Sequence, residues 1–173
     1  MQYYSAEIHL YEICFKMSSS DRTEYILESL RFIDLIYAYF LSTRSFFESL
    51  FSVSALDYCT LSAVNVGQMF HAIGALYKLS IFDVPEWDVK QVRKELDLSV
   101  VLDHIANKME QAGNQYRLTE EEGPWQLCTR KMKLMIVWWE GVLAQEGASA
   151  PVPAMPQVDP MSDFDFLNDN YWR

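Results

Sequence analysis

The sequence predicts an all-α fold, an irregular multi-helix domain of about six or seven helices with a flexible acidic C-terminal tail. Large apolar residues recur at steps of three and four through most of the chain, which is the spacing of an amphipathic helix. No segment shows the convincing apolar–polar alternation that a half-buried strand requires. Prolines, which break helices, gather near the end of the chain, where four of the six are found: Pro151, Pro153, Pro156 and Pro160.

The first third of the chain carries three candidate helices. Ile8, Tyr11 and Phe15 suggest a short one. A longer helix over about 18–43 follows, because its sequence opens with Ser and Asp residues that cap helices well. Residues 44–53 are compatible with another short helix. The apolar stripe expected on the longer helix consists of Tyr25, Ile26, Leu30, Ile33, Tyr37, Phe40 and Leu41.

A longer apolar pattern over residues 56–81 predicts a buried, central helix. Small residues along it would let a neighbouring helix approach closely, and packing must offset the helix propensity lost at Gly67 and Gly74. The residues expected to face one way are Leu61, Val64, Met69, Ala72, Ile73, Leu76 and Leu79.

Two further helices follow from the pattern in the second half of the chain. The clearer one lies within residues 96–115 and is expected to stop at Gly113 and Asn114. The other begins with Pro124, whose missing N–H is harmless in a first turn, and ends at Gly147. Their stripes are Leu98, Val101, Leu102, Ile105, Met109 and Ala112 in the first, and Cys128, Met132, Met135, Trp139 and Val142 in the second.

The segment between these patterns raises the question of what its tryptophan does. Asp88 can cap a following helix with Gln91 as its capping-box partner, and Asp83 with Glu86 offers the same arrangement earlier, so the start of that helix stays open. Trp87 is large enough to fill the corner between two helices. We therefore interpret it as a packing residue rather than as part of a reaction centre.

Length and composition favour one domain with a tail. The chain has 173 residues, of which 50% are hydrophobic, and this is ample for a core. We expect a helical domain over 1–147, a proline-rich linker over 148–160 and an acidic, aromatic tail over 161–173. The formal net charge of -10 argues against direct nucleic-acid binding, which needs clustered Lys and Arg.

Cysteine usage and hydropathy point to a soluble intracellular protein. Cys14, Cys59 and Cys128 are far apart and form no CxxC pair, which is typical of buried thiols in a reducing compartment. The N-terminal residues lack the basic start and apolar stretch of a secretory signal. No stretch reaches the roughly 18 uncharged apolar residues of a membrane helix, so no membrane association is expected.

No catalytic, metal or cofactor site is predicted. His9 and Glu12 are one helical turn apart and Asp103 adjoins His104, but neither pair has a third ligand at a matching spacing. The acidic run after residue 162 alternates with Phe, which does not suit a rigid metal site. The 8 Met, 10 Phe, 10 Tyr and 5 Trp residues fill irregular cores well but could also line a ligand pocket. The alternative interpretation is therefore an all-α enzyme or a metabolite-binding helical receptor with a Met- and aromatic-rich interior.

The segment 75–113 resembles the second half of the regulatory domain of fungal binuclear-zinc-cluster transcription factors, the fungal-specific transcription factor domain. Residues 37–42, "YAYFLS", are similar to a further family pattern upstream, and the tail is similar at Phe166, Leu167 and Trp172. The residues that form the family's structural signature here are Lys78, Leu79, Asp83, Pro85, Trp87, Asp88, Arg93 and Asp97, accompanied by Ser80, Val92, Leu96 and Leu98.

The resemblance implies a nuclear, non-enzymatic regulatory domain that controls activation of target genes. The basic six-cysteine DNA-binding segment, the coiled-coil stretch and the first half of the domain are not found in this sequence, so a fragment, a mis-bounded gene product or a truncated relative is expected. Zinc would belong to that DNA-binding segment, and no cofactor is expected in this chain. The expected partners are a coactivator, the other half of the domain or a second copy, with a small-molecule effector possible.

The tail carries the candidate partner-binding residues. Its acidic residues would keep the apolar side chains solvated until a coactivator groove accepts them, which is the logic of an acidic activation segment. The alternative is that the tail packs back onto its own domain. The residues concerned are Phe164, Phe166, Leu167, Tyr171 and Trp172.

Overall fold

The computed structural model describes residues 1–17, 29–82, 84, 86–115 and 124–146. Over these residues the protein is all-α, which confirms the predicted fold class, while the linker 148–160 and the tail 161–173 lie outside them. The described elements are α1 (Gln2–Met17), α2 (Ser29–Ser52), the 3-10 helix η1 (Asp57–Thr60), α3 (Ala63–Ile81), α4 (Val89–Glu95), α5 (Leu98–Gln115) and α6 (Pro124–Glu146).

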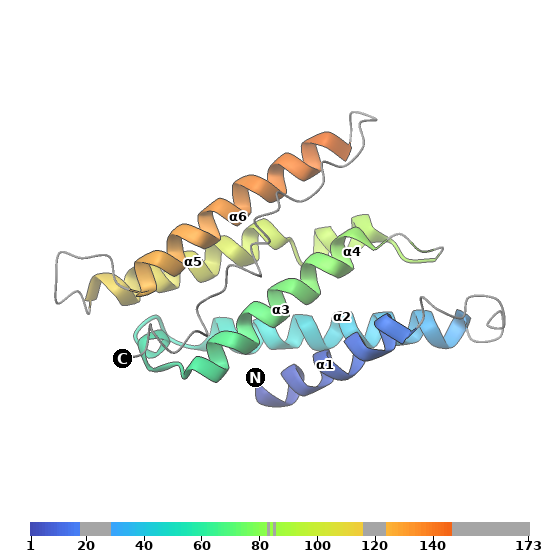
Figure 1. Cartoon of the computed structure of the whole chain (residues 1–173), viewed down its shortest axis with the longest axis horizontal. Helices are drawn as coiled ribbons and strands as arrows, with labels where there is room; N and C mark the ends of the chain where they lie inside the picture. The colour runs from blue at the N-terminus through green and yellow to red at the C-terminus, as the bar shows by residue number, and fades with distance from the viewer. Residues whose placement is uncertain (18–28, 83, 85, 116–123, 147–173) are drawn as a thin grey trace.

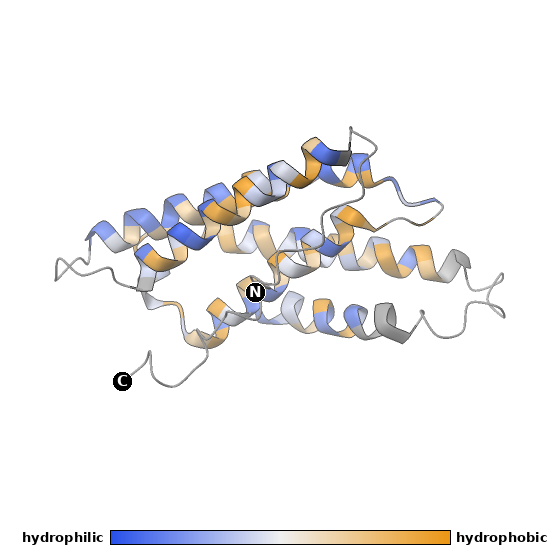
Figure 2. Cartoon of the chain, turned by 45° about the horizontal axis from the view of Figure 1, so that its top comes forward, coloured by the Kyte–Doolittle hydropathy of each residue, from blue (hydrophilic) through white to orange (hydrophobic). Residues whose placement is uncertain are grey.

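Helix α3 is the central element of the bundle (Figure 1). It contacts α1 and α2 on one side and α4 and α5 on the other, whereas α6 packs chiefly on α5. Hydrophobic residues occur along each of the helices (Figure 2). On α3 the buried ones are Val66, Met69, Phe70, Ala72, Ile73, Ala75, Leu76 and Leu79. The prediction of a buried central helix is therefore confirmed, although this helix begins at Ala63, with Ser62 accepting a capping hydrogen bond from the Asn65 N–H at 3.2 Å.

Helix α2 differs from its prediction in two ways. It runs unbroken through Thr43, whose hydroxyl donates to the Tyr39 carbonyl at 2.8 Å, so the short helix expected over 44–53 is the second half of α2. Its buried face includes Ile36 and Tyr39, while the predicted Tyr37 and Leu41 are exposed by 48% and 56%. Apolar residues occur on several faces of this part of α2, so the periodicity of the sequence does not show which face is buried.

The predicted stripes of α5 and α6 are largely confirmed. All six residues expected on α5 are buried, as are Cys128, Met132, Trp139 and Val142 on α6, with Met135 half-buried. The prediction for Val64 of α3 is wrong, because this residue was expected on the buried stripe of that helix and is 64% exposed.

Gly113 does not end α5, which continues to Gln115. A Cβ atom at this glycine would lie 3.2 Å from the Trp125 Cβ and 3.1 Å from the Gln126 Nε2. The glycine therefore marks the close approach of the first turn of α6 rather than a helix stop.

The segment after α2 is tied to α5 by Lys108. Its ammonium group donates to the Phe51 carbonyl at 2.6 Å and to the Val53 carbonyl, where α2 ends. The same ammonium lies 5.4 Å from the ring centre of the buried Tyr58 in η1. A cation at a helix C-terminus interacts favourably with the free carbonyl groups there, so Lys108 stabilises both the end of α2 and its contact with α5.

Two features of the helices bear on membrane crossing and on thiol chemistry. Within the described ranges, none of the helices combines the length and apolar character needed to cross a bilayer. Cys128 is a buried free thiol, and burial raises its pKa to about 11. A thiol with such a pKa is protonated at neutral pH and acts as a small apolar side chain.

Candidate functional site

Most of the predicted structural signature meets at the corner where α3 gives way to α4. Trp87 is 6% exposed, and its ring packs edge-on against Tyr37 and Phe40 of α2, with ring centres 5.0 and 6.2 Å away. Its indole N–H donates to the Leu79 carbonyl at 3.1 Å. That carbonyl belongs to the last turn of α3, where no intrahelical donor is left, so Trp87 both fills the corner and caps the helix.

Two of the three aspartates of the signature, Asp88 and Asp97, begin the next two helices. An oxygen of Asp88 accepts from the Gln91 N–H at 3.0 Å, which decides between the two starts that the sequence left open for α4. Asp97 accepts from the Ser99 N–H at 2.7 Å at the start of α5. Glu86 precedes them with a φ of 76°, a left-handed conformation that is uncommon for a residue with a side chain. Asp83 and Pro85 lie outside the described residues.

Arg93 joins the corner to α6. Its Nε donates to the Ser80 carbonyl at 2.8 Å, another acceptor in the last turn of α3. The guanidinium carbon lies 5.3 Å from the ring centre of Trp139, which is the arrangement of a cation–π contact. One side chain thus stabilises the end of α3 and the position of α6 together.

We expect Arg93→Met to lower the free energy of unfolding by about 1.5–3 kcal/mol, because the variant keeps the apolar stem but loses a charged donor and the cation–π contact. Chemical unfolding followed by circular dichroism measures this difference. Lys94→Met is the matched control, since Lys94 is exposed on the same helix and its replacement should change the stability by no more than about 0.5 kcal/mol. Equal losses in the two variants would contradict the role of Arg93.

Lys78, the remaining signature residue, faces α1 instead of the corner. Its ammonium group forms an ion pair with Glu12, whose other carboxylate oxygen lies 2.5 Å from the His71 Nε2. The His71 ring in turn stacks on the His9 ring, with centres 3.8 Å apart and planes inclined by 19°. The sequence placed His9 and Glu12 one turn apart but gave no sign that His71 of α3 would lie beside them.

The charge states of this cluster follow from its contacts. Burial opposes ionisation of Glu12, but the hydrogen bonds from Lys78 and His71 outweigh it and lower the pKa of the carboxyl to about 2. Burial lowers the pKa of His71, although its hydrogen bond with Glu12 acts in the opposite direction. At neutral pH the cluster therefore combines an ionised carboxylate with an imidazole that burial keeps from charging.

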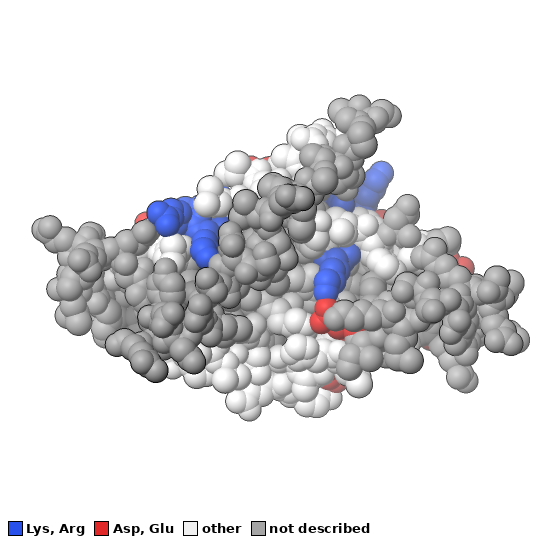
Figure 3. All heavy atoms as spheres, in the orientation of Figure 1, with Lys and Arg blue, Asp and Glu red and all other residues white. Residues whose placement is uncertain are grey.

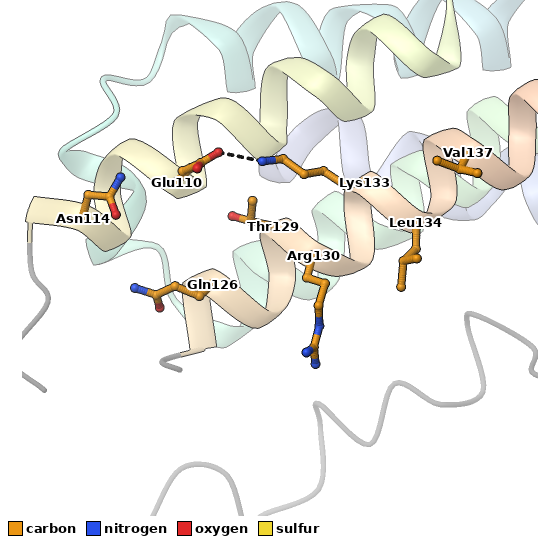
Figure 4. Close-up of a pocket in the computed structure, with 8 residues that line it drawn as sticks. All are labelled: Glu110, Asn114, Gln126, Thr129, Arg130, Lys133, Leu134 and Val137. Carbon is orange, nitrogen blue, oxygen red and sulfur yellow. Dashed lines mark hydrogen bonds and ion pairs between the residues drawn. The ribbon is translucent and has the colours of Figure 1, made fainter. Parts of the chain in front are cut away.

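A shallow groove lies between α5 and α6 (Figure 4). Its volume is about 380 Å³, and Glu110 and Lys133 point toward each other across it, with their charged groups 2.9 Å apart. The rest of its lining is Asn114 of α5 and, on α6, Gln126, Thr129, Arg130, Leu134 and Val137. The groove is lined by neither Met nor aromatic side chains, so it is not the Met- and aromatic-rich pocket of the alternative interpretation.

The basic side chains on the face seen in Figure 3 occur as small separate groups rather than as one continuous patch.

The predicted activation residues, from Phe164 to Trp172, lie outside the described part of the chain. Of the predicted residues, the structure thus brings together those of the α3–α4 corner. The sequence did not reveal the cluster of His9, Glu12 and His71.

Comparison with known proteins shows the family to which this chain belongs. Transcription factor opdL of Penicillium oxalicum is 26% identical to this chain over 118 residues, which are 68% of this chain and 20% of that protein. The chain therefore spans about a fifth of the length of the curated relative it matches. No solved structure matches the chain. A family model, that of the ATEG07667_C C-terminal domain, matches residues 55–173, which include the corner, α5 and α6. Because this match covers more than half of the sequence, the chain belongs to the ATEG07667_C C-terminal domain family.

Proposed function

We propose that this chain is a regulatory, non-catalytic region of a fungal transcription factor that acts in the nucleus through protein contacts. The observation that carries the proposal is the relationship to Transcription factor opdL over 118 residues. The region of the family match, residues 55–173, begins before η1 and takes in the whole α3–α4 corner.

The geometry of the corner supports a scaffold rather than a reaction centre. Trp87 and Arg93 donate to carbonyl groups at the end of α3, and Asp88 and Asp97 begin the next two helices. Each of these polar groups satisfies the backbone of a helix end. A net charge of -10 further favours protein partners over the phosphate backbone of DNA.

Partner binding has two proposed locations on the chain. On the helical domain, Leu134 and Val137 of α6 and Tyr3 and Leu10 of α1 are exposed apolar side chains, each at least 60% accessible. They suit contact with further helices of a longer regulatory domain or with a second copy. In the tail, acidic residues alternate with the apolar side chains of 164–172, which suits folding on a coactivator surface.

Fusion of the full chain to a heterologous DNA-binding domain tests the activation motif. We expect reporter transcription from this fusion, and a loss of most of it when the five apolar tail residues become alanine, because the acidic residues alone offer little apolar surface to a coactivator groove. Reporter output, normalised to the amount of fusion protein, is the measurement. The five residues are Phe164, Phe166, Leu167, Tyr171 and Trp172.

The matched control replaces the apolar side chains of the proline-rich stretch, which removes similar groups next to the motif without touching it. This control should retain the activity of the parent fusion. Absence of activation by the parent, or an equal loss in both variants, would refute the activation motif. The replaced control residues are Val152, Met155 and Val158.

A further inference from the structure

Two histidines and a carboxylate converge between α1 and α3. His9 and Glu12 are three residues apart on α1 and therefore on one face of that helix, and His71 reaches them from α3. One ligand atom from each residue lies within 4.8 Å of the others. Glu12 and His71 are 59 positions apart in the sequence, so the fold rather than a local motif brings them together.

The three groups have the chemistry of metal ligands. Imidazole nitrogen suits Zn²⁺ and the neighbouring transition metals, whereas Mg²⁺ and Ca²⁺ prefer sites made wholly of oxygen. His71 has a second feature of interest, because its Nδ1 is buried and has no hydrogen-bond partner among the described residues. Only Nε2 of this ring is therefore engaged by the described residues, and a buried polar atom without a partner points to a further group, such as an ion or a water, at the cluster.

We propose that His9, Glu12 and His71 form a binding site for a divalent transition metal ion, with Zn²⁺ as the ion that the donor set suits best. Two imidazoles and one carboxylate supply three ligands, and a fourth position is left for water or for a group from a partner. His9 is on the exposed side of the cluster, so the ion can enter from solvent. The site goes beyond the proposed regulatory function and does not depend on it.

The present geometry needs only a small adjustment to take the ion. Ligand atoms of a tetrahedral zinc site lie about 3.3 Å apart, given metal–ligand distances of about 2.0–2.1 Å. Glu12 and His71 are 2.5 Å apart, so these two groups must separate by roughly 1 Å, while the stacked ring of His9 turns a nitrogen toward them. Lys78 is the competing cation, because its ammonium group already occupies the other oxygen of Glu12.

Calorimetric titration of the full chain with ZnCl₂ tests the site. We expect one equivalent of Zn²⁺ to bind and His9→Ala to weaken binding by about 100-fold or more, since loss even of a group that only supports a ligand costs 10–100-fold. His9 is exposed, so this variant should fold normally, which far-ultraviolet circular dichroism checks. Lys78→Met should strengthen binding on the order of tenfold, because it removes a positive charge beside the ion.

The third histidine of the chain provides the control. His104 of α5 packs against Phe51 of α2 and is not one of the clustered ligands, so His104→Ala should bind Zn²⁺ as the parent does. Mg²⁺ should give no comparable binding. The proposal is overturned if the parent chain does not bind Zn²⁺, if His9→Ala binds it with unchanged affinity, or if Mg²⁺ binds equally well, which would indicate a carboxylate site elsewhere.

Discussion

Trp87→Ala is expected to lower the free energy of unfolding by about 3–5 kcal/mol, the usual cost of removing a fully buried aromatic side chain. Three contributions are lost together: the buried ring area, the edge-on contacts with Tyr37 and Phe40, and the hydrogen bond to the Leu79 carbonyl. For a chain of this size the melting temperature should fall by about 6–20 °C. Thermal unfolding followed by circular dichroism measures the change.

Trp87→Phe separates the packing of the ring from its hydrogen bond. The variant keeps an aromatic ring at the corner but leaves the Leu79 carbonyl without the indole donor, so we expect a smaller loss of about 1–3 kcal/mol. A melting temperature of Trp87→Ala equal to that of the parent would show that the corner does not depend on this side chain. Equal losses in the two variants would assign the effect to the hydrogen bond alone.

Trp139→Ala is expected to have a similar cost of about 3–5 kcal/mol and to loosen α6. Trp139 is 1% exposed, its ring lies edge-on to Tyr77 of α3 at 5.8 Å between centres, and Arg93 of α4 lies over it. These contacts reach past α5, on which α6 otherwise chiefly packs. Their loss should therefore raise amide hydrogen exchange in α6 more than in α3.

Val137→Ala is the matched control on the same helix. Val137 is 68% exposed, so its truncation should alter stability by no more than about 0.5 kcal/mol and leave the exchange of α6 unchanged. If Trp139→Ala destabilised α3 and α6 equally, the tryptophan would be a general core residue rather than the attachment of α6.

How well the buried residues of a helix could be predicted depended on how its apolar residues are spaced. On α5 the apolar residues other than the exposed Val100 occupy one face, and charged and amide side chains occupy the other, so the whole buried stripe could be predicted. On α2 the apolar residues Ile36, Tyr37 and Tyr39 are close neighbours that point in different directions, and the exposed Tyr37 was assigned to the core. The burial of each of them was decided by α1 and α3, which pack against this helix.

The contacts of polar residues at helix ends could likewise be predicted where they depend on local spacing, but not where they depend on how helices pack. The capping role of Asp88 was one of two alternatives that the sequence offered, because capping depends on a spacing of three residues. The donation from Arg93 to the Ser80 carbonyl could not be anticipated, since it depends on the angle at which α4 leaves the corner. Likewise, the closeness of His71 to His9 depends on how α1 lies on α3.

The arrangement of α3 between two helix pairs has a consequence for the order of assembly. The pairs α1–α2 and α5–α6 each join helices that are consecutive in the chain, so each can close at a modest loss of loop entropy. Contacts such as that between Glu12 and Lys78 span 66 positions and form only when α3 has docked. We therefore expect the docking of α3 between two hairpins that form locally to limit the rate of folding, because the contacts of longest sequence separation form at that step.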